Sequence, residues 1–227
     1  MKKIMNVAID GPAGAGKSTI ARRAAKELGY IYVDTGAMYR GMAYHMLKKG
    51  IDLKDEAAVS AEAEKLSVSI SYENGEQAVL VNGENVTPFI RTPEVSAAAS
   101  TVSAYPKVRA ALLNLQKDLA KKQSVLMDGR DIGTVVLPQA DVKIFLTASA
   151  EIRGKRRYDE LIAKGQTADL DQIIEDVKKR DEQDMNRAIA PLRQAEDAIL
   201  VDSSHMSIEE VTDRIVSLVK AEEERGK

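Results

Sequence analysis

A glycine-rich segment near the start of the chain follows the pattern G-x-x-x-x-G-K-[ST], from Gly11 to Lys17 and Ser18. The apolar run 7–9 precedes it and a helix-like stretch, 19–28, follows it. In this order of strand, loop and helix, backbone N–H groups and the helix N-terminus point at the same phosphate. The pattern therefore predicts a nucleoside triphosphate site with Mg²⁺ bound at Ser18. The residues predicted to bind the triphosphate are Gly11, Pro12, Ala13, Gly14, Ala15, Gly16, Lys17, Ser18 and Thr19.

Short apolar runs of strand length recur along the chain, with helical patterns between them. Parallel strands covered on both faces by crossover helices have this continuous apolar character. The pattern predicts an α/β fold, a doubly wound parallel five-stranded sheet with helices on both faces. The predicted strands are 7–9, 30–33, 125–127, 142–146 and 198–201.

Aspartates follow several of these predicted strands. In open α/β sheets ligands bind beyond the carboxyl ends of the strands, so Asp10, Asp34 and Asp128 are candidates for chemistry. Asp202 is followed by two serines, and we expect it to form a turn instead.

Two regions interrupt the alternation of strands and helices. Residues 66–91 contain alternating strand patterns joined by Asn-Gly turns, which predicts a small antiparallel β insert. Residues 151–193 form charged helical stretches, either a solvated hairpin or a helical lid that closes over the nucleotide. We expect one P-loop unit in which the remaining segments form the core, namely 1–65, 92–150 and 194–227.

Arginines gather on two helix faces of the charged region. An exposed face usually alternates its charges, so a stripe of arginines indicates that they bind an anion. Plain solvation of these faces remains the alternative. The two faces carry Arg180, Asp184 and Arg187, and Arg153, Arg156 and Arg157.

The composition excludes several classes of function. The chain has 33 basic and 35 acidic residues, and its net charge of -2 gives no overall attraction to nucleic acid or membranes. It has no cysteine, so disulfides, thiolate metal sites and a cysteine nucleophile are absent. No apolar stretch approaches the roughly 20 residues of a membrane span. We expect a soluble, cytoplasmic monomer.

Two further features are expected to be structural. His45 and His205 are isolated, and we expect them on the surface or in packing roles. A capping box opens at Ser207 and starts an amphipathic helix near the C-terminus. Its predicted core side carries Ile208, Val211, Ile215, Leu218 and Val219.

Five sequence blocks together resemble the bacterial cytidylate kinases, a family of nucleoside monophosphate kinases. The resemblance covers nearly the whole chain, and the second and fourth blocks make it highly specific. The blocks are residues 10–19, 34–40 (DTGAMYR), 90–95, 128–134 (DGRDIGT), and Arg180-Asp181 with Asn186-Arg187.

The resemblance implies transfer of the γ-phosphoryl group of ATP to CMP, and to dCMP, with Mg²⁺ as the cofactor. It makes 66–91 the monophosphate-side insert and 151–193 the lid. It also implies which residues handle the phosphates. Those that would hold the CMP phosphate are Arg40, Arg130 and Arg187. The residues that would stabilise negative charge on the transferring phosphoryl group are Lys17, Arg156 and Arg157, together with Arg130 and Arg187.

By the same resemblance, Ser100, Arg109 and Asp131 would read cytosine, and Arg180 and Asp184 would contact the ribose. The remaining members of the implied CMP site are Thr35 and Asp128. A carboxylate at Asp131 accepts a hydrogen bond from the exocyclic amine of cytosine but opposes the carbonyl oxygen of uracil. The acceptor phosphate is already ionised, so the transfer requires positioning and positive charge and no general base.

Other functions remain open at this point. One is another small-molecule kinase of the same fold, such as a shikimate or gluconate kinase, which would lack the cytosine-reading residues. Another is a nucleotide-dependent switch or binding module, although the chain has no N-K-x-D guanine-reading motif. A nucleic-acid ATPase is disfavoured by the 4% aromatic content, because stacking platforms need exposed rings.

Overall fold

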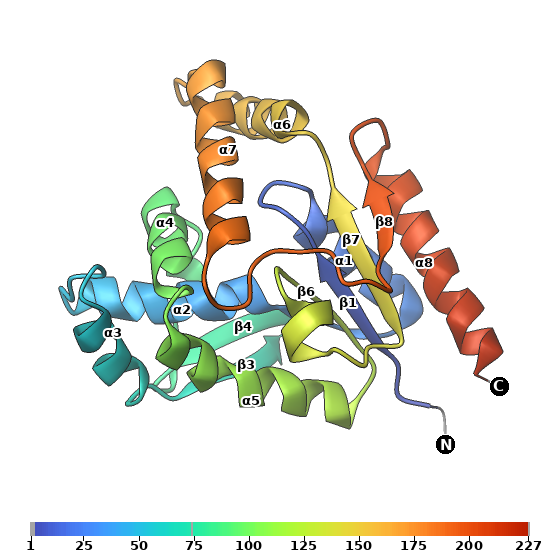
Figure 1. Cartoon of the computed structure of the whole chain (residues 1–227), viewed down its shortest axis with the longest axis horizontal. Helices are drawn as coiled ribbons and strands as arrows, with labels where there is room; N and C mark the ends of the chain where they lie inside the picture. Colours follow the sequence, from blue (N-terminus) through green and yellow to red (C-terminus); the bar gives the residue numbers. More distant parts are fainter. Residues whose placement is uncertain (1–2, 74, 227) are drawn as a thin grey trace. The chain divides into compact units, whose positions relative to one another are not determined.

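The computed structural model describes residues 3–73 and 75–226. Figure 1 labels most of its helices and strands. The chain forms two compact units. The first contains the residues up to Tyr32 and those from Ser124 onward, and the second contains Val33–Gln123.

The large sheet has five strands in the order β2-β6-β1-β7-β8. The β1–β6, β1–β7 and β7–β8 pairs are parallel. All the predicted strands are present, and the predicted fold class is confirmed. The strand bounds are β1 (Asn6–Asp10), β2 (Ile31–Asp34), β6 (Val125–Gly129), β7 (Val142–Thr147) and β8 (Ile199–Asp202).

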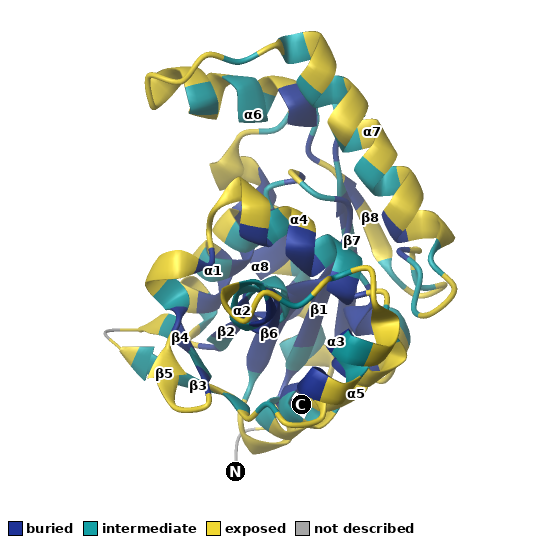
Figure 2. Cartoon of the chain, turned by 90° about the vertical axis from the view of Figure 1, so that its left-hand side faces the viewer, coloured by how far each residue is buried: buried dark blue, intermediate teal, exposed yellow. Residues whose placement is uncertain are grey.

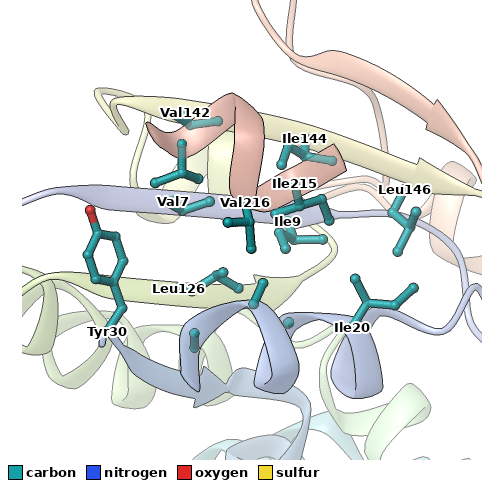
Figure 3. Close-up of a cluster of buried hydrophobic side chains, with 14 of the residues drawn as sticks. Val7, Ile9, Ile20, Tyr30, Leu126, Val142, Ile144, Leu146, Ile215 and Val216 are labelled. Atoms are coloured by element: carbon teal, nitrogen blue, oxygen red, sulfur yellow. The ribbon is translucent and has the colours of Figure 1, made fainter. Parts of the chain in front are cut away.

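Burial explains why continuous apolar runs identify these strands. Every residue of β6 is buried, as are four of the five in β1, and both strands lie in the buried interior in Figure 2. Figure 3 shows the main apolar cluster, in which side chains of β1, β6 and β7 pack against Ile20 of α1 and against Ile215 and Val216 of α8. The burial of these apolar side chains makes the main favourable contribution to the stability of the large sheet and its covering helices.

The last helix of the first unit, α8, begins where the capping box predicts. Ser207 and Glu210 form the predicted capping box of α8, each side chain accepting from the backbone N–H of the other. Val211, Ile215 and Val219 are buried as predicted, but Ile208 is 47% exposed. That part of the prediction was wrong. The helix bounds are α1 (Lys17–Leu28), η2 (Ile132–Val136), α6 (Ala150–Ala163), α7 (Leu170–Asn186) and α8 (Ile208–Arg225).

The predicted antiparallel insert is a three-stranded sheet of order β3-β4-β5 in the second unit. Asn82 and Gly83, with φ of 52° and 82°, form the tight turn between β4 and β5. The other predicted Asn-Gly turn contains Asn74, which lies outside the described residues. The bounds in this unit are α2 (Thr35–Lys48), α3 (Glu56–Ala63), β3 (Val68–Glu73), β4 (Glu76–Val81), β5 (Glu84–Asn85), η1 (Thr87–Phe89), α4 (Pro93–Val102) and α5 (Pro106–Lys122).

This small sheet packs against its flanking helices. Residues 33–65 and 92–123 belong to the same compact unit as 66–91. The reason is a shared apolar cluster that joins Ala37 of α2, Val79 of β4 and Val95 of α4. The predicted division into a core, an insert of residues 66–91 and a lid stays a prediction. Among the residues described, no helix is long and apolar enough to cross a membrane.

Candidate active site

The phosphate loop connects β1 to α1 and contains backbone conformations that require glycine. Gly11 has φ of 150°, and a Cβ there would lie 1.9 Å from the carbonyl oxygen of Leu146. Gly16 caps α1 in the left-handed region, with φ of 86°. The loop thus passes close to β7 and presents the N-terminus of α1, the arrangement that binds phosphate.

Lys17 is buried, with only 6% of its surface exposed. Its Nζ donates to the carbonyl oxygens of Gly11 and Pro12, each at 2.7 Å. Burial, and then the nearby Arg130 guanidinium, hold the pKa of Lys17 well below its usual range, while Asp128 raises it. The amine is therefore held inside the loop by hydrogen bonds that a phosphate can replace.

Asp128, at the end of β6, lies against the phosphate loop. Its Oδ2 accepts from the Ser18 hydroxyl at 3.0 Å, and its Oδ1 accepts from the buried Tyr32 hydroxyl at 3.1 Å. A hydroxyl and a carboxylate placed together suit Mg²⁺, which takes one or two carboxylate-type ligands and completes its shell with phosphates and water. No cluster of three or more acidic, His or Cys ligands occurs within 3–73 and 75–226.

Asp10 ends the neighbouring strand β1 and is 5% exposed. Its Oδ1 accepts from the backbone N–H of Ile132 at 2.8 Å and its Oδ2 from that of Gly133 at 2.7 Å. Burial raises the pKa of Asp10 to about 6, against the lowering effect of these two hydrogen bonds. Asp10 therefore connects the strand before the phosphate loop to the turn after Asp131.

This raised pKa predicts a pH dependence of stability. Between the usual value near 3.8 and about 6, the folded protein holds more protons at Asp10 than the unfolded chain. The contribution of Asp10 to the free energy of unfolding therefore falls as the pH rises through this window. Relative to Asp10→Asn, the wild type should lose on the order of 3 kcal/mol between pH 4 and pH 7. Urea denaturation of both proteins across this range measures the difference, and a flat difference would contradict the raised pKa.

Two arginines predicted to hold the CMP phosphate are paired with buried carboxylates in the first unit. The Arg130 Nε donates to Asp184 Oδ2 at 2.9 Å. The Arg187 Nη2 lies 3.5 Å from Asp131 Oδ1, and its Nε donates to the Ala190 carbonyl at 2.6 Å. Each pair brings together two residues that the sequence analysis assigned to the CMP site.

The structure corrects the expectation that Arg180, Asp184 and Arg187 share one helix face. α7 ends at Asn186, and Arg187 has left the helix with φ of -63° and ψ of 142°. The following segment turns back, and the Leu192 N–H donates to the Asp184 carbonyl at 2.8 Å. Arg187 thus reaches Asp131 from a loop.

The other arginine stripe, on α6, is divided among three environments. Arg153 is buried, pairs with Asp181 of α7 and donates to the Ala13 carbonyl of the phosphate loop at 2.9 Å. Arg156 donates to the Ser203 carbonyl at 2.7 Å. The third member, Arg157, forms an exposed pair with Glu160 at 2.9 Å.

The remaining predicted residues lie in the second unit. Arg40 of α2 donates to Asp34 Oδ2 at 3.0 Å, while Asp34 Oδ1 caps α2 by accepting from the Ala37 N–H at 2.8 Å. The Arg109 guanidinium lies over the Tyr39 ring, 5.6 Å from its centroid. Two further members occupy helices of this unit, the buried Thr35 at the start of α2 and Ser100 in α4.

The predicted residues are divided between the two units. Those of the first unit are Lys17, Ser18, Asp128, Arg130, Asp131, Arg156, Arg157, Arg180, Asp184 and Arg187, and those of the second are Thr35, Arg40, Ser100 and Arg109.

Sequence reasoning missed the connecting roles of three residues. Asp10 holds η2, Tyr32 orients Asp128, and Gln77 exchanges two hydrogen bonds with the backbone of Asp34. The position of Asp10 at a strand end was the only sequence signal for any of these three.

The expectations for Asp202 and the two histidines were correct. Asp202 forms the expected turn, accepting from the Ser204 N–H at 2.9 Å. The His45 ring nitrogen lies 2.9 Å from Glu62, a packing role, and His205 is exposed.

Comparison with known proteins places these features in a family. Residues 7–221 match the model of the cytidylate kinase family. The cytidylate kinase of Caldicellulosiruptor bescii is 52% identical over 218 residues, which cover 96% of each chain. That of an Exiguobacterium species is 50% identical over 220 residues, covering 97% of this chain and 98% of the relative.

A solved structure supports the fold only. A gluconokinase from Sinorhizobium meliloti superposes with a TM-score of 0.51 at 12% identity, covering 99% of this chain and 97% of the other. That identity is too low to indicate an acceptor. The near-complete matches at about half identity do decide the family, and this chain belongs to the cytidylate kinases.

Proposed function

We propose that this chain phosphorylates CMP and dCMP with ATP through an acceptor site formed by the paired arginines Arg130 and Arg187. ATP-dependent phosphorylation of CMP is the activity of its family. The observation that supports the arrangement is a contact between the two sides of the site. Asp128, two residues before Arg130, accepts from the Ser18 hydroxyl of the phosphate loop at 3.0 Å, so the segment that carries Arg130 adjoins the donor loop.

On the donor side, the phosphate loop binds the triphosphate of ATP. Its backbone N–H groups and the N-terminus of α1 face the phosphates. Lys17 exchanges the Gly11 and Pro12 carbonyls for phosphate oxygens. This exchange places a positive charge, already desolvated, beside the group that moves.

Mg²⁺ is the proposed cofactor, held with the ATP phosphates by Ser18 and, directly or through water, by Asp128. When bound, the ion neutralises charge on the transferring phosphate. The family resemblance assigns Asp128 to the CMP site, and its hydrogen bond with Ser18 supports a metal role as well. Tyr32 fixes the orientation of this carboxylate through its own hydroxyl.

On the acceptor side, the proposed ligands of the CMP phosphate are Arg40, Arg130 and Arg187. Each guanidinium has one edge or nitrogen occupied by a carboxylate, and an arginine presents five N–H donors. The carboxylates therefore fix the orientation of the arginines while other donors remain for phosphate. In-line transfer between two polyanions depends mainly on such positioning.

Specificity for the base and sugar is assigned to polar side chains. We assign cytosine to Ser100, Arg109 and Asp131, and the ribose to Arg180 and Asp184. The proposed role of Thr35 is to line the CMP site. Asp131 is 4% exposed, and a buried acceptor left opposite the carbonyl of uracil costs binding energy.

The charged hairpin of α6 and α7 is proposed to be the lid, within 151–193. Arg156 and Arg157 would supply charge to the moving group when the lid closes, and both have partners that a phosphate can displace. Segment 66–91 is proposed to act on the monophosphate side. Its Gln77 holds the backbone of Asp34, which in turn pairs with Arg40. Monomeric state and cytoplasmic location stay predictions from the sequence.

Asp131→Asn tests the assignment of the base. The amide offers either an oxygen or an NH₂ group, so cytosine keeps a partner and uracil gains one. The wild-type clash is worth about 1–3 kcal/mol, so the ratio of kcat/KM for CMP over UMP should narrow by roughly tenfold. Steady-state kinetics with both nucleotides measure the ratio.

The control variant is Asp159→Asn, which removes an exposed carboxylate paired with Lys155 on α6. It should leave the ratio unchanged. If Asp131 only holds Arg187 in place, its substitution will depress kcat/KM for CMP and UMP equally, and the base-reading role would then be wrong.

A further inference from the structure

Asp10 caps a turn that is distant in sequence. The first N–H groups of a helix have no partner within it and are commonly satisfied by the side chain of the residue just before it. For η2 that residue is Asp131, yet its side chain makes no capping hydrogen bond. The N–H groups of Ile132 and Gly133 donate to Asp10 instead.

Because Asp10 caps η2 in place of Asp131, the Asp131 carboxylate can take another partner. The Asp131 backbone carbonyl remains part of η2, accepting from the Val135 N–H at 2.9 Å. Its carboxylate lies toward Arg187, 3.5 Å from the Nη2 atom. Asp10 thus performs the capping that would otherwise draw the Asp131 carboxylate toward its own backbone.

The geometry leaves Asp10 little freedom to move. It is 5% exposed, lies in register with Gly129 of β6 and immediately precedes Gly11 of the phosphate loop. A Cβ on Gly133 would lie 3.4 Å from the Oδ2 atom of Asp10 and 3.2 Å from the Lys143 side chain. The turn is therefore packed directly onto the strand that carries the phosphate loop.

We propose that Asp10 is a specificity-positioning residue, which caps η2 from β1 so that the Asp131 carboxylate faces the acceptor base. The proposal rests on the proposed function, in which Asp131 reads cytosine. It adds that selectivity for the base depends on a residue adjoining the ATP-binding loop. Asp10 itself contacts neither base nor phosphate in this role.

Asp10→Asn is the test, because the two N–H groups use different carboxylate oxygens and an amide has only one acceptor oxygen. The NH₂ group of the amide then opposes the N–H that had donated to the other oxygen. Asp131 is expected to turn toward the vacated N–H, and the ratio of kcat/KM for CMP over UMP should narrow roughly tenfold, as for Asp131→Asn. Should the Asn variant fail to fold, Asp10→Glu displaces the carboxylate by one methylene and is expected to narrow the ratio in the same direction.

The double variant separates positioning from a general loss of structure. If Asp10 acts through Asp131, Asp10→Asn combined with Asp131→Asn should narrow the ratio no further than Asp131→Asn alone. If the double variant narrows the ratio by the product of the two single effects, the two residues act independently and the proposal is overturned. The control is Asp202→Asn, at the exposed end of β8, where a carboxylate accepts from the Ser204 backbone and hydroxyl. Its ratio should equal that of the wild type.

The single variants distinguish this proposal from the function on which it rests. A changed ratio in Asp131→Asn with an unchanged ratio in Asp10→Asn overturns the positioning role and leaves base reading intact. An unchanged ratio in Asp131→Asn overturns base reading and the Asp10 proposal with it, while phosphorylation of CMP by the wild type still supports the kinase function.

Discussion

Replacing Lys17 with methionine should lower kcat by about a hundred- to a thousandfold, because one preorganised charge at a transferring phosphate contributes about 3–4 kcal/mol. Methionine has a similar length and is apolar, so it can occupy the buried channel of the lysine side chain. Its cost to the fold is confined to the Gly11 and Pro12 carbonyls, which lose their shared donor. Steady-state kinetics at saturating ATP and CMP measure the effect on kcat.

Lys26→Met is the matched control, since Lys26 is an exposed lysine on the same helix. It should leave kcat unchanged. Circular dichroism confirms that both variants fold. A folded Lys17→Met protein with near-normal kcat would refute the assigned role of this lysine in transfer.

Arg130→Met should lower kcat/KM for CMP by roughly a hundredfold or more, because it removes a charge proposed to contact the acceptor phosphate. It should also destabilise the fold by about 3 kcal/mol, since Asp184 would remain buried without its partner. Loss of activity and loss of stability therefore occur together in this variant. Kinetics and urea denaturation measure the two quantities separately.

A second substitution separates the two losses. Arg130→Met combined with Asp184→Asn removes the uncompensated charge, so the free energy of unfolding should recover. Because Asp184 is itself assigned to the ribose, Asp184→Asn alone is the reference, and kcat/KM for CMP in the double variant should stay far below that reference. Recovery of both quantities would show that Arg130 serves the fold alone, and would remove it from the acceptor site.

The sequence predicted most of the fold because its signals are local. Each strand of the large sheet is a short apolar run, and the phosphate loop is defined by residues next to one another between 11 and 18. The capping box at Ser207 involves side chains only three positions apart. Patterns of this kind depend only on neighbouring residues, so the strands and helices that they predict can be located without knowledge of the tertiary structure.

The contacts that the sequence did not predict join residues far apart along the chain. Asp10 and Ile132 are 122 positions apart, and Ser18 and Asp128 are 110 apart. Helical periodicity predicted that Arg187 lies on a helix face. The helix α7 instead ends one residue earlier, at Asn186, and Arg187 pairs with Asp131 from the following loop. Helix ends are set by such tertiary contacts as much as by local propensity.

The insert shows the same limit. Alternation and Asn-Gly turns identified β3, β4 and β5 correctly, but they do not show what the strands pack against. Val79 and Val81 form one cluster with helices on either side of the insert in sequence. The compact unit is therefore larger than the segment that its turn signals marked.

The most direct test of the account is the rate of ADP release from ATP with a series of acceptors: CMP, dCMP, UMP, AMP, shikimate and gluconate. The account predicts the highest kcat/KM for CMP and dCMP, a value at least about tenfold lower for UMP, and no stimulation by shikimate or gluconate. A folded protein that releases ADP fastest with AMP, shikimate or gluconate, or that shows no CMP-dependent release, would contradict it.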